Sequence, residues 1–273
     1  MSETVVLTWT IAPSKNVVMT PNQKYNSTSL DPKKREKEYY EAIKFYLEKS
    51  DFTTLIFCDN SNYDFSYADE LQHIAKEKWK TLELLKFQWD VELVTTISHW
   101  VWEAEIFDFV YENSKELHKN KTWFKVTWRY IISNINEIIK KLKEQDCYFQ
   151  KWIFGKGRNF LNVSTATFKI SNKIFEEYLY KNTIKRVLLL KEIERNWKKL
   201  KEIEYLLEYI FYSCLRNFLL KEYKKHTKKK AIYFDYKNKQ HTSQPFYKWF
   251  YRFWIFDFNF INNILDRLFY CSY

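Results

Sequence analysis

Short apolar runs alternate with amphipathic stretches along the first half of the chain. The apolar runs are typical of buried strands and lie at 4–10, 52–58, 81–87 and 123–127. Helix-period patterns lie at 32–49, 67–78, 103–117 and 134–144. This order of strands and helices predicts an α/β fold with a Rossmann-like, mainly parallel sheet flanked by helices.

The helix expected over 32–49 has the clearest local signals. Asp31 is a good N-cap, and Pro32 suits the first helical position. The residues of its apolar face are Tyr39, Ile43, Tyr46 and Leu47.

The regular alternation ends near 145–165. Beyond it we expect strands at 147–154 and 166–170 and helices at 172–181, 185–225 and 258–269. The pattern therefore predicts an α/β half over 1–145 and a half over 146–273 with long helices and a basic, aromatic tail. The two halves are expected to form one continuous domain.

Tryptophan and glycine occur in unusual numbers, with 11 Trp and 2 Gly in 273 residues. An average chain has about 7% Gly, or roughly 19 residues at this length. Trp9, Trp100, Trp102 and Trp128 stand near strand ends or helix starts, where a backbone often needs Gly. We interpret several of them as Gly in the organism, encoded by a reassigned stop codon. The alternative is a Trp-rich protein from an AT-rich genome, and ordinary Trp codons at these four positions would exclude the reassignment.

The net charge of +11 favours anionic partners such as nucleic acid, acidic lipid or phosphorylated ligands. Charge is densest over 221–230, which also fits a solvated helix end. Residues 246–254 mix aromatic and cationic side chains, as at a membrane interface or in a buried tail. The four Cys are widely spaced, which indicates reduced thiols. The first residues show neither the basic region nor the apolar core that is typical of a signal peptide, and no apolar stretch of about 18 residues occurs, so we expect a cytoplasmic protein.

The loops after parallel strands meet at one sheet edge, where open α/β sheets bind ligands. Thr8 and Thr10 flank Trp9, and with Gly at position 9 their main chain could approach a ligand closely. Asp59 and Asn60 end the second strand, where they would bond a ribose or a base, or would form an Asx turn.

Further candidates follow the later strands. His99 precedes the helix over 103–117, whose N-terminal amides suit a pyrophosphate, with a structural role as the alternative. Arg129 offers a planar fork to phosphate oxygens or forms a surface ion pair. Glu204 and Glu208 share one expected helix face; either is a candidate general base, and both also fit an ordinary helix surface.

With Gly at the four Trp positions, four phrases occur in order: LT(G)TIAP, FCDNSNYDF, SH(G)V(G)EAEIFDF and FKVT(G)RYIISNI. On these phrases the chain resembles bacterial glycosyltransferases of the GT-A class that are encoded with capsule and surface-polysaccharide genes. The resemblance covers about residues 4–135 and continues more weakly through TATFKISNKIFEEYL and the helix that carries Glu208. It implies that the half over 1–145 binds a nucleotide sugar and that the half over 146–273 faces the acceptor.

The resemblance also implies roles for single residues. Those that would line the donor nucleotide are Thr8, Thr10, Asp59 and Asn60. Arg129 would face the phosphates, and Glu208 would lie near the acceptor. The class usually binds a divalent metal through an Asp-x-Asp motif, which this chain lacks. Either Arg129 replaces the metal, or single carboxylates bind it, or the chain is not catalytic.

We therefore expect a glycosyltransferase that moves a sugar from a nucleotide-sugar donor to a hydroxyl of a surface polysaccharide or lipid-linked glycan. Its basic, aromatic C-terminal part would dock at the inner membrane face. Two other functions stay open: non-enzymatic binding of nucleic acid or another anionic surface, and a degenerate transferase kept as a scaffold.

Overall fold

The computed structural model describes residues 3–12, 31–92, 101–127, 130–153, 161–196, 214 and 236–237. Within these ranges the strands are β1 (Thr4–Trp9), β2 (Thr54–Asp59), β3 (Thr81–Lys86), β4 (Thr122–Thr127), β5 (Ile131–Ile132), β6 (Cys147–Ile153), β7 (Leu161–Ser171) and β8 (Tyr236–Lys237). The helices are α2 (Pro32–Lys49), α3 (Ala68–Glu77), α5 (Val101–Asn113), α6 (Ile135–Leu142), α7 (Asn172–Ile174) and α8 (Asn182–Asn196), with a 3-10 turn at Leu117–Lys119 and a π-helical turn at Phe175–Leu179.

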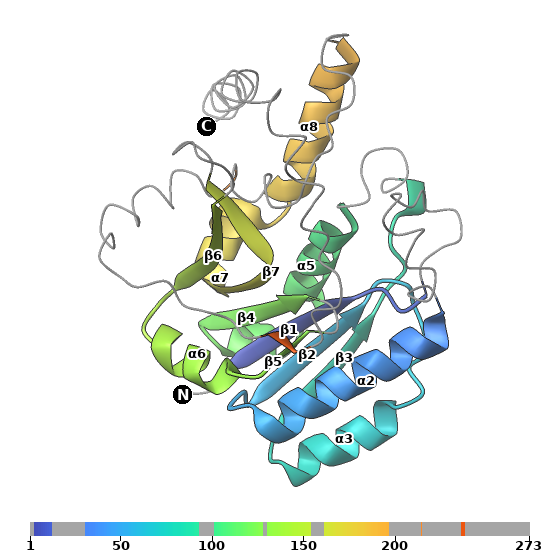
Figure 1. Ribbon diagram of the computed structural model, residues 1–273. Helices are drawn as coiled ribbons and strands as arrows, with labels where there is room; N and C mark the ends of the chain where they lie inside the picture. Colours follow the sequence, from blue (N-terminus) through green and yellow to red (C-terminus); the bar gives the residue numbers. More distant parts are fainter. Residues whose placement is uncertain are drawn as a thin grey trace. The chain divides into compact units, whose positions relative to one another are not determined.

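Six strands form one sheet in the order β3-β2-β1-β4-β7-β6 (Figure 1). The first four strands along the chain, β1 to β4, are mutually parallel. β7 runs antiparallel to β4, and β6 runs antiparallel to β7. The expected α/β fold with a Rossmann-like, mainly parallel sheet is therefore confirmed. The chain proceeds from β1 outward to β3 and then returns to β4 on the other side of β1, so the strand order reverses between β1 and β4.

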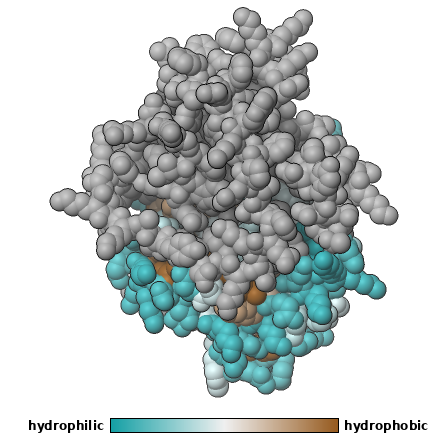
Figure 2. All heavy atoms as spheres, viewed as in Figure 1, coloured by the Kyte–Doolittle hydropathy of each residue, from teal (hydrophilic) through white to brown (hydrophobic). Residues whose placement is uncertain are grey.

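Helices cover both faces of this sheet. α2, α3 and α6 pack on the face that carries Val5 and Leu7 of β1, and together they form one apolar core. α5 and the turns after β7 pack on the opposite face, against Val6 and Phe168. Strand side chains alternate between faces, which explains why neighbouring residues of β1 contribute to different cores. Figure 2 shows that the outer surface over α2 and α3 is largely hydrophilic.

α2 begins and ends where the sequence predicts. The Asp31 carboxylate accepts a hydrogen bond from the Lys33 amide at 3.0 Å, and Pro32 occupies the first turn. These features satisfy an N-terminal amide that would otherwise lack a partner. All four residues of the expected apolar face are buried: Tyr39, Ile43, Tyr46 and Leu47.

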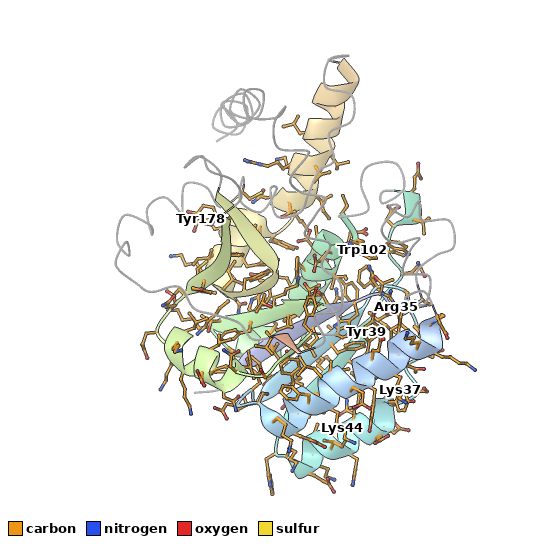
Figure 3. The ribbon with its side chains drawn as sticks, in the orientation of Figure 1. Arg35, Lys37, Tyr39, Lys44, Trp102 and Tyr178 are labelled. Atoms are coloured by element: carbon orange, nitrogen blue, oxygen red, sulfur yellow. The ribbon has the colours of Figure 1, made fainter. Side chains whose placement is uncertain are left out.

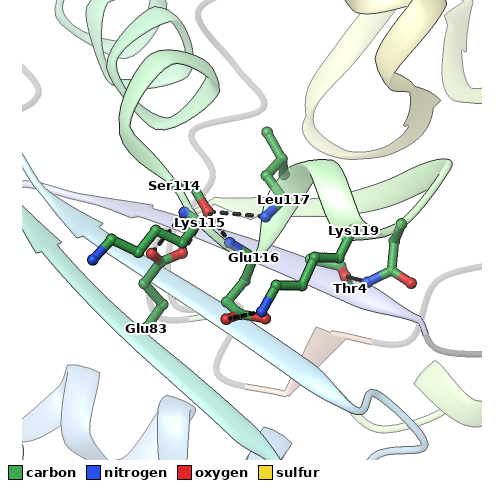
Figure 4. A network of polar contacts seen from close by, with 8 residues as sticks. Thr4, Glu83, Ser114, Lys115, Glu116, Leu117 and Lys119 are labelled. Atoms are coloured by element: carbon green, nitrogen blue, oxygen red, sulfur yellow. Dashed lines mark hydrogen bonds and ion pairs between the residues drawn. The ribbon is translucent and has the colours of Figure 1, made fainter.

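A network of polar contacts fixes the connection between α5 and β4, and we name it the Glu83 network (Figure 4). The hydroxyl of Ser114 donates to the Glu83 carboxylate of β3 and accepts from the Leu117 amide at 3.0 Å. Glu83 also accepts from the Lys115 amide at 2.9 Å. Near this network, the Asn120 side chain donates to the Thr4 hydroxyl at 2.7 Å. These contacts lie toward the amino ends of the parallel strands, because α5 runs back across the sheet.

The second half of the chain differs more from expectation. β7 begins at Leu161 rather than at 166, and its antiparallel direction was not predicted. β5 and β8 form a small antiparallel pair that the sequence pattern did not indicate. Only the first part of the helical region expected over 185–225 falls within α8, and the helix expected over 258–269 lies outside the described residues.

The chain divides into two compact units, Met1–Asn238 and Lys239–Tyr273, and the second lies wholly outside the described residues. Within the first unit, β6 and β7 belong to the same sheet as β1 to β4. The division into halves at 145 stays a prediction.

Candidate functional site

A pocket opens at the carboxyl end of β1. Its lining residues are Thr8, Trp9, Thr10, Arg35, Tyr39, Trp102, Glu103 and Ile106. α2 supplies Arg35 and Tyr39 from one face of the sheet, and α5 supplies Trp102 and Glu103 from the other. Figure 3 shows the three labelled lining residues, Arg35, Tyr39 and Trp102, at this end of the sheet. The pocket therefore lies beside the reversal of strand order, where ligands bind in open α/β sheets.

The predicted residues Thr10 and Asn60 bond each other across the ends of β1 and β2. The Thr10 hydroxyl donates to the Asn60 side-chain oxygen at 2.6 Å. Asn60 is fully buried, and its side-chain nitrogen has no hydrogen-bond partner in the structure. Burying an amide nitrogen away from water without a hydrogen-bond partner is unfavourable. The Asn60 side chain can therefore still donate hydrogen bonds to a ligand close to the pocket.

Asp59 holds two loops together. One carboxylate oxygen accepts from the Ile11 amide at 2.8 Å, while the other accepts from the amides of Ser61 and Tyr63 at 3.0 and 2.9 Å. Burial raises the pKa of Asp59, and the hydrogen bonds oppose that rise. The contacts to Ser61 and Tyr63 correspond to the turn-forming alternative considered from the sequence. The role of Asp59 as a ribose ligand stays a prediction.

Arg35 and Tyr39 meet at the carbonyl of Thr10. The Arg35 Nε donates to this oxygen at 2.9 Å, Nη2 also donates to it, and the Tyr39 hydroxyl donates at 3.1 Å. The guanidinium carbon lies 5.7 Å from the centre of the Tyr39 ring. This arrangement holds a permanent positive charge at the pocket, in a geometry that suits an anionic ligand.

A buried ion pair lies on the α5 side of the pocket. Lys125 of β4 is fully buried, and its ammonium group pairs with the carboxylate of Glu103. The same carboxylate oxygen accepts from the hydroxyls of Thr8 at 3.3 Å and Thr127 at 2.9 Å. We name these four residues the Glu103 cluster. It joins α5 to both β1 and β4 on either side of the strand reversal.

The indole of Trp9 is crowded. Its ring centroid lies 3.5 Å from that of Tyr39 at 88°, whereas aromatic pairs prefer about 4.5–7 Å. Its Nε1 is buried without a hydrogen-bond partner. With Trp9 and Trp102 among its lining residues, the pocket has a cavity volume of about 20 Å³, enough for a water molecule but far too small for a nucleotide.

The predicted site residues fall into two groups. Thr8 and Thr10 line the pocket. Asp59 ends β2 and Asn60 follows it, and their side chains bond the Ile11 amide and the Thr10 hydroxyl. The residues that lie outside the described ranges are His99, Trp100, Trp128, Arg129, Glu204 and Glu208. Their proximity to the pocket and their roles stay predictions.

Three residues that line the pocket were not predicted as site residues from the sequence: Arg35, Tyr39 and Glu103. The position of Arg35 was predictable, because a helix that follows a parallel strand begins at the carboxyl edge of the sheet, and Arg35 lies in the first turns of α2. The sequence also indicated that Lys125 needs a partner such as Glu103. A Lys within an otherwise apolar strand requires an anionic or polar partner when it is buried.

Two further properties concern metals and membranes. Among the residues that the structure describes, no group of three His, Cys, Asp or Glu side chains is placed to hold a metal ion. Over the same residues, no helix combines the length and the apolar character needed to cross a bilayer.

Comparisons with known proteins give only distant structural similarities. No protein-family model matches the chain, and no curated protein matches it. Among solved structures, the glycosyltransferase GlyE of Streptococcus pneumoniae TIGR4 is similar at 12% identity with a TM-score of 0.42, over 78% of this chain and 43% of that one. HddC from Yersinia pseudotuberculosis is similar at 12% identity with a TM-score of 0.32, over 65% of this chain and 80% of that one. The chain thus spans less than half of the GlyE structure, and similarities of this size do not establish an activity.

Proposed function

We propose that the chain is a glycosyltransferase that binds a nucleotide-sugar donor at the carboxyl edge of its sheet. The observation that carries the proposal is the position of the pocket beside the strand reversal, with Arg35 on one side and the Glu103 cluster on the other. Because the cavity of about 20 Å³ admits no nucleotide, the proposal requires Gly in place of the indoles at positions 9 and 102. A ligand placed there meets a cation, two threonine hydroxyls and main chain from β1. These groups match a sugar nucleotide, which combines a diphosphate with many hydroxyls.

The proposed sugar transfer depends on stabilising the negative charge of the leaving group. Sugar transfer leaves a nucleoside diphosphate, and cations aimed at its phosphates stabilise the negative charge that develops on them. We assign that role to Arg35, with Arg129 as a second cation and with His99, which precedes α5 in the sequence, as a further group near the phosphates. The hydroxyls of Thr8 and Thr10 and the amide of Asn60 would fix the nucleotide. Holding donor and acceptor in place supplies much of the remaining rate enhancement.

The acceptor side is assigned from the sequence. Glu208, or else Glu204, would take the proton from the acceptor hydroxyl. The acceptor would be a surface polysaccharide or a lipid-linked glycan at the cytoplasmic face of the membrane. The dense positive charge over 221–230 supports contact with an anionic lipid surface. Whether a divalent metal assists is left to the experiment, because cationic side chains and a metal can fill the same role.

A thermal-shift screen tests donor binding. Purified protein is heated with UDP, GDP, CDP and dTDP, with and without Mg²⁺, and nucleotide sugars of the stabilising base are then tested for diphosphate release. One nucleoside diphosphate should raise Tm, because saturation at about 100 times Kd adds about 2.7 kcal/mol of stability. The screen should be run on the chain as written and with Gly at positions 9, 100, 102 and 128. No shift with any nucleotide in either protein would contradict the proposal.

The same preparations discriminate the alternatives. A nucleic-acid binder would instead bind oligonucleotides with an affinity that falls steeply with salt. A protein that binds a nucleoside diphosphate without turnover of any sugar donor would be the degenerate transferase. For the membrane assignment, deleting 221–256 should weaken binding to vesicles of acidic phospholipid and leave nucleotide binding intact; unchanged vesicle binding would contradict it.

A further inference from the structure

Trp79 occupies a backbone position that is suited to glycine. It comes immediately after Lys78, the C-cap of α3, and has φ of 55°, in the left-handed region. That region is disfavoured for any residue with a Cβ atom and is a clear outlier for a bulky one. The indole is 94% exposed, so packing in the core does not explain its presence.

The hydrogen bonds around Trp79 form a complete helix-terminating turn. The Lys80 amide donates to the Ala75 carbonyl at 2.9 Å, and the Trp79 amide donates to the Lys76 carbonyl at 3.1 Å. This pair of bonds defines a Schellman motif with Trp79 at the residue after the C-cap. Glycine is the usual residue at that position, because the left-handed conformation carries no penalty there without a side chain.

We infer that position 79 is glycine in the organism's own protein, and that the chain contains tryptophans written for codons that the organism reads as glycine. Position 79 was not among the four positions singled out from the sequence. Its backbone dihedral angle and its hydrogen bonds are independent of any ligand-binding hypothesis. The inference therefore stands whether or not the chain is a transferase.

The same assignment accounts for the crowded pocket. Trp9 lies too close to Tyr39 for an ordinary aromatic pair, and Trp9 and Trp102 leave room for little more than one water molecule. Glycine at 9 and 102 would replace two pocket walls with bare main chain and would open a site for a larger ligand.

Not every tryptophan fits this description. Trp123 of β4 is buried on the α5 face, and its ring centroid lies 6.4, 5.7 and 5.5 Å from those of Phe107, Phe168 and Phe175. These are ordinary aromatic separations, and an emptied site there would leave a cavity in the core. Trp123 is therefore the contrasting position for the experiment.

The test compares Tm for the chain as written and for Trp79→Gly, Trp79→Ala and Trp123→Gly. Both Trp79 variants remove the exposed indole, so the difference between them isolates the Cβ atom. Trp79→Gly should melt about 2–4 °C above Trp79→Ala, and Trp123→Gly should melt below the parent. If Trp79→Gly is no more stable than Trp79→Ala, position 79 does not need glycine and the structural part of the inference is wrong.

Decoding is tested separately. In protein isolated from its natural source, cleavage after glutamate releases the peptide from Lys78 to Glu83, whose mass distinguishes Gly from Trp at position 79. We expect the glycine mass and, in the gene, a codon that the standard code reads as a stop. The tryptophan mass would overturn the decoding part, even if the glycine variant were the more stable protein.

Discussion

The Glu83 network and the Glu103 cluster both contain a carboxylate that receives several hydrogen bonds, yet they differ in charge balance. Glu83 accepts from the Ser114 hydroxyl and from the Lys115 amide, both uncharged donors, and it connects neighbouring elements. Glu103 pairs with a fully buried lysine and receives two further hydroxyls beside the pocket. Removing two full charges from water is unfavourable, and an apolar pair is often as stable. The comparison suggests that the first network serves the fold and that the second serves the site.

The largest effect should come from separating the buried pair. Lys125→Met leaves Glu103 buried without its cation and should lower the free energy of unfolding by about 3–5 kcal/mol. Urea denaturation measures this change. In the double variant Lys125→Met/Glu103→Gln, no charge is left without a partner, so most of the loss should be recovered. Equal destabilisation in the single and double variants would show that packing, rather than charge, dominates.

The next effect concerns the cation on the α2 side of the pocket and depends on the proposed donor site. Arg35→Met should weaken binding of the stabilising nucleoside diphosphate by about 2 kcal/mol, or roughly 30-fold, because a charge-assisted hydrogen bond to phosphate is lost. Titration calorimetry gives the affinity. Lys37→Met is the matched control, since Lys37 is exposed on the same helix (Figure 3). Equal losses in both variants would indicate a general charge effect instead of a site contact.

The Glu83 network should give a smaller effect that is limited to stability. Ser114→Ala removes one acceptor for the Leu117 amide and one donor to Glu83, and it should lower the free energy of unfolding by about 1 kcal/mol. Nucleotide affinity should not change. A clear loss of nucleotide binding in this variant would show that the Glu83 network, like the Glu103 cluster, contributes to the site.

The smallest effect is a change in pH dependence. Burial raises the pKa of Glu105 and of Asp108 to about 7. A carboxyl with a raised pKa keeps its proton in the folded protein over a range where the unfolded chain releases it. Stability from these groups is therefore full at low pH and is lost as pH rises from about 4.5 toward 7 for Glu105.

Glu105→Gln cannot titrate and should reduce the fall in Tm between about pH 5 and about pH 8. Glu105 lies two residues after Glu103 on α5, and one of its carboxylate oxygens is buried without a hydrogen-bond partner. Glu105 therefore shows how burial raises the pKa of a carboxyl on α5 when no cation among the described residues is paired with it. An unchanged slope in the variant would place the pH dependence elsewhere.

Local signals in the sequence determined much of the fold. Asp31 and Pro32 located the start of α2, and the apolar runs located β1 to β4 because such runs need burial on both faces. The direction of β7 was not predictable, since alternation of apolar residues is the same in parallel and antiparallel strands. The pairing of β5 with β8 joins residues about a hundred positions apart, and no local pattern encodes it.

The candidate site was predictable in part. Thr8 and Thr10 followed from their position at the end of β1. Arg35 was missed because its approach to the Thr10 carbonyl depends on how α2 packs across the sheet. The partner of Lys125 lies on another element, so a sequence pattern can indicate that a partner is needed without identifying Glu103.

The Glu103 cluster also has a mechanical consequence. Thr8 belongs to β1, and Lys125 and Thr127 belong to β4, yet all three bond a single residue of α5. The start of α5 is therefore anchored to two strands at once and cannot shift without breaking several buried bonds. On the opposite side, Arg35 and Tyr39 of α2 donate to the Thr10 carbonyl near the end of β1. A bound molecule should therefore meet, on the α5 side, a wall whose position is fixed by two neighbouring strands.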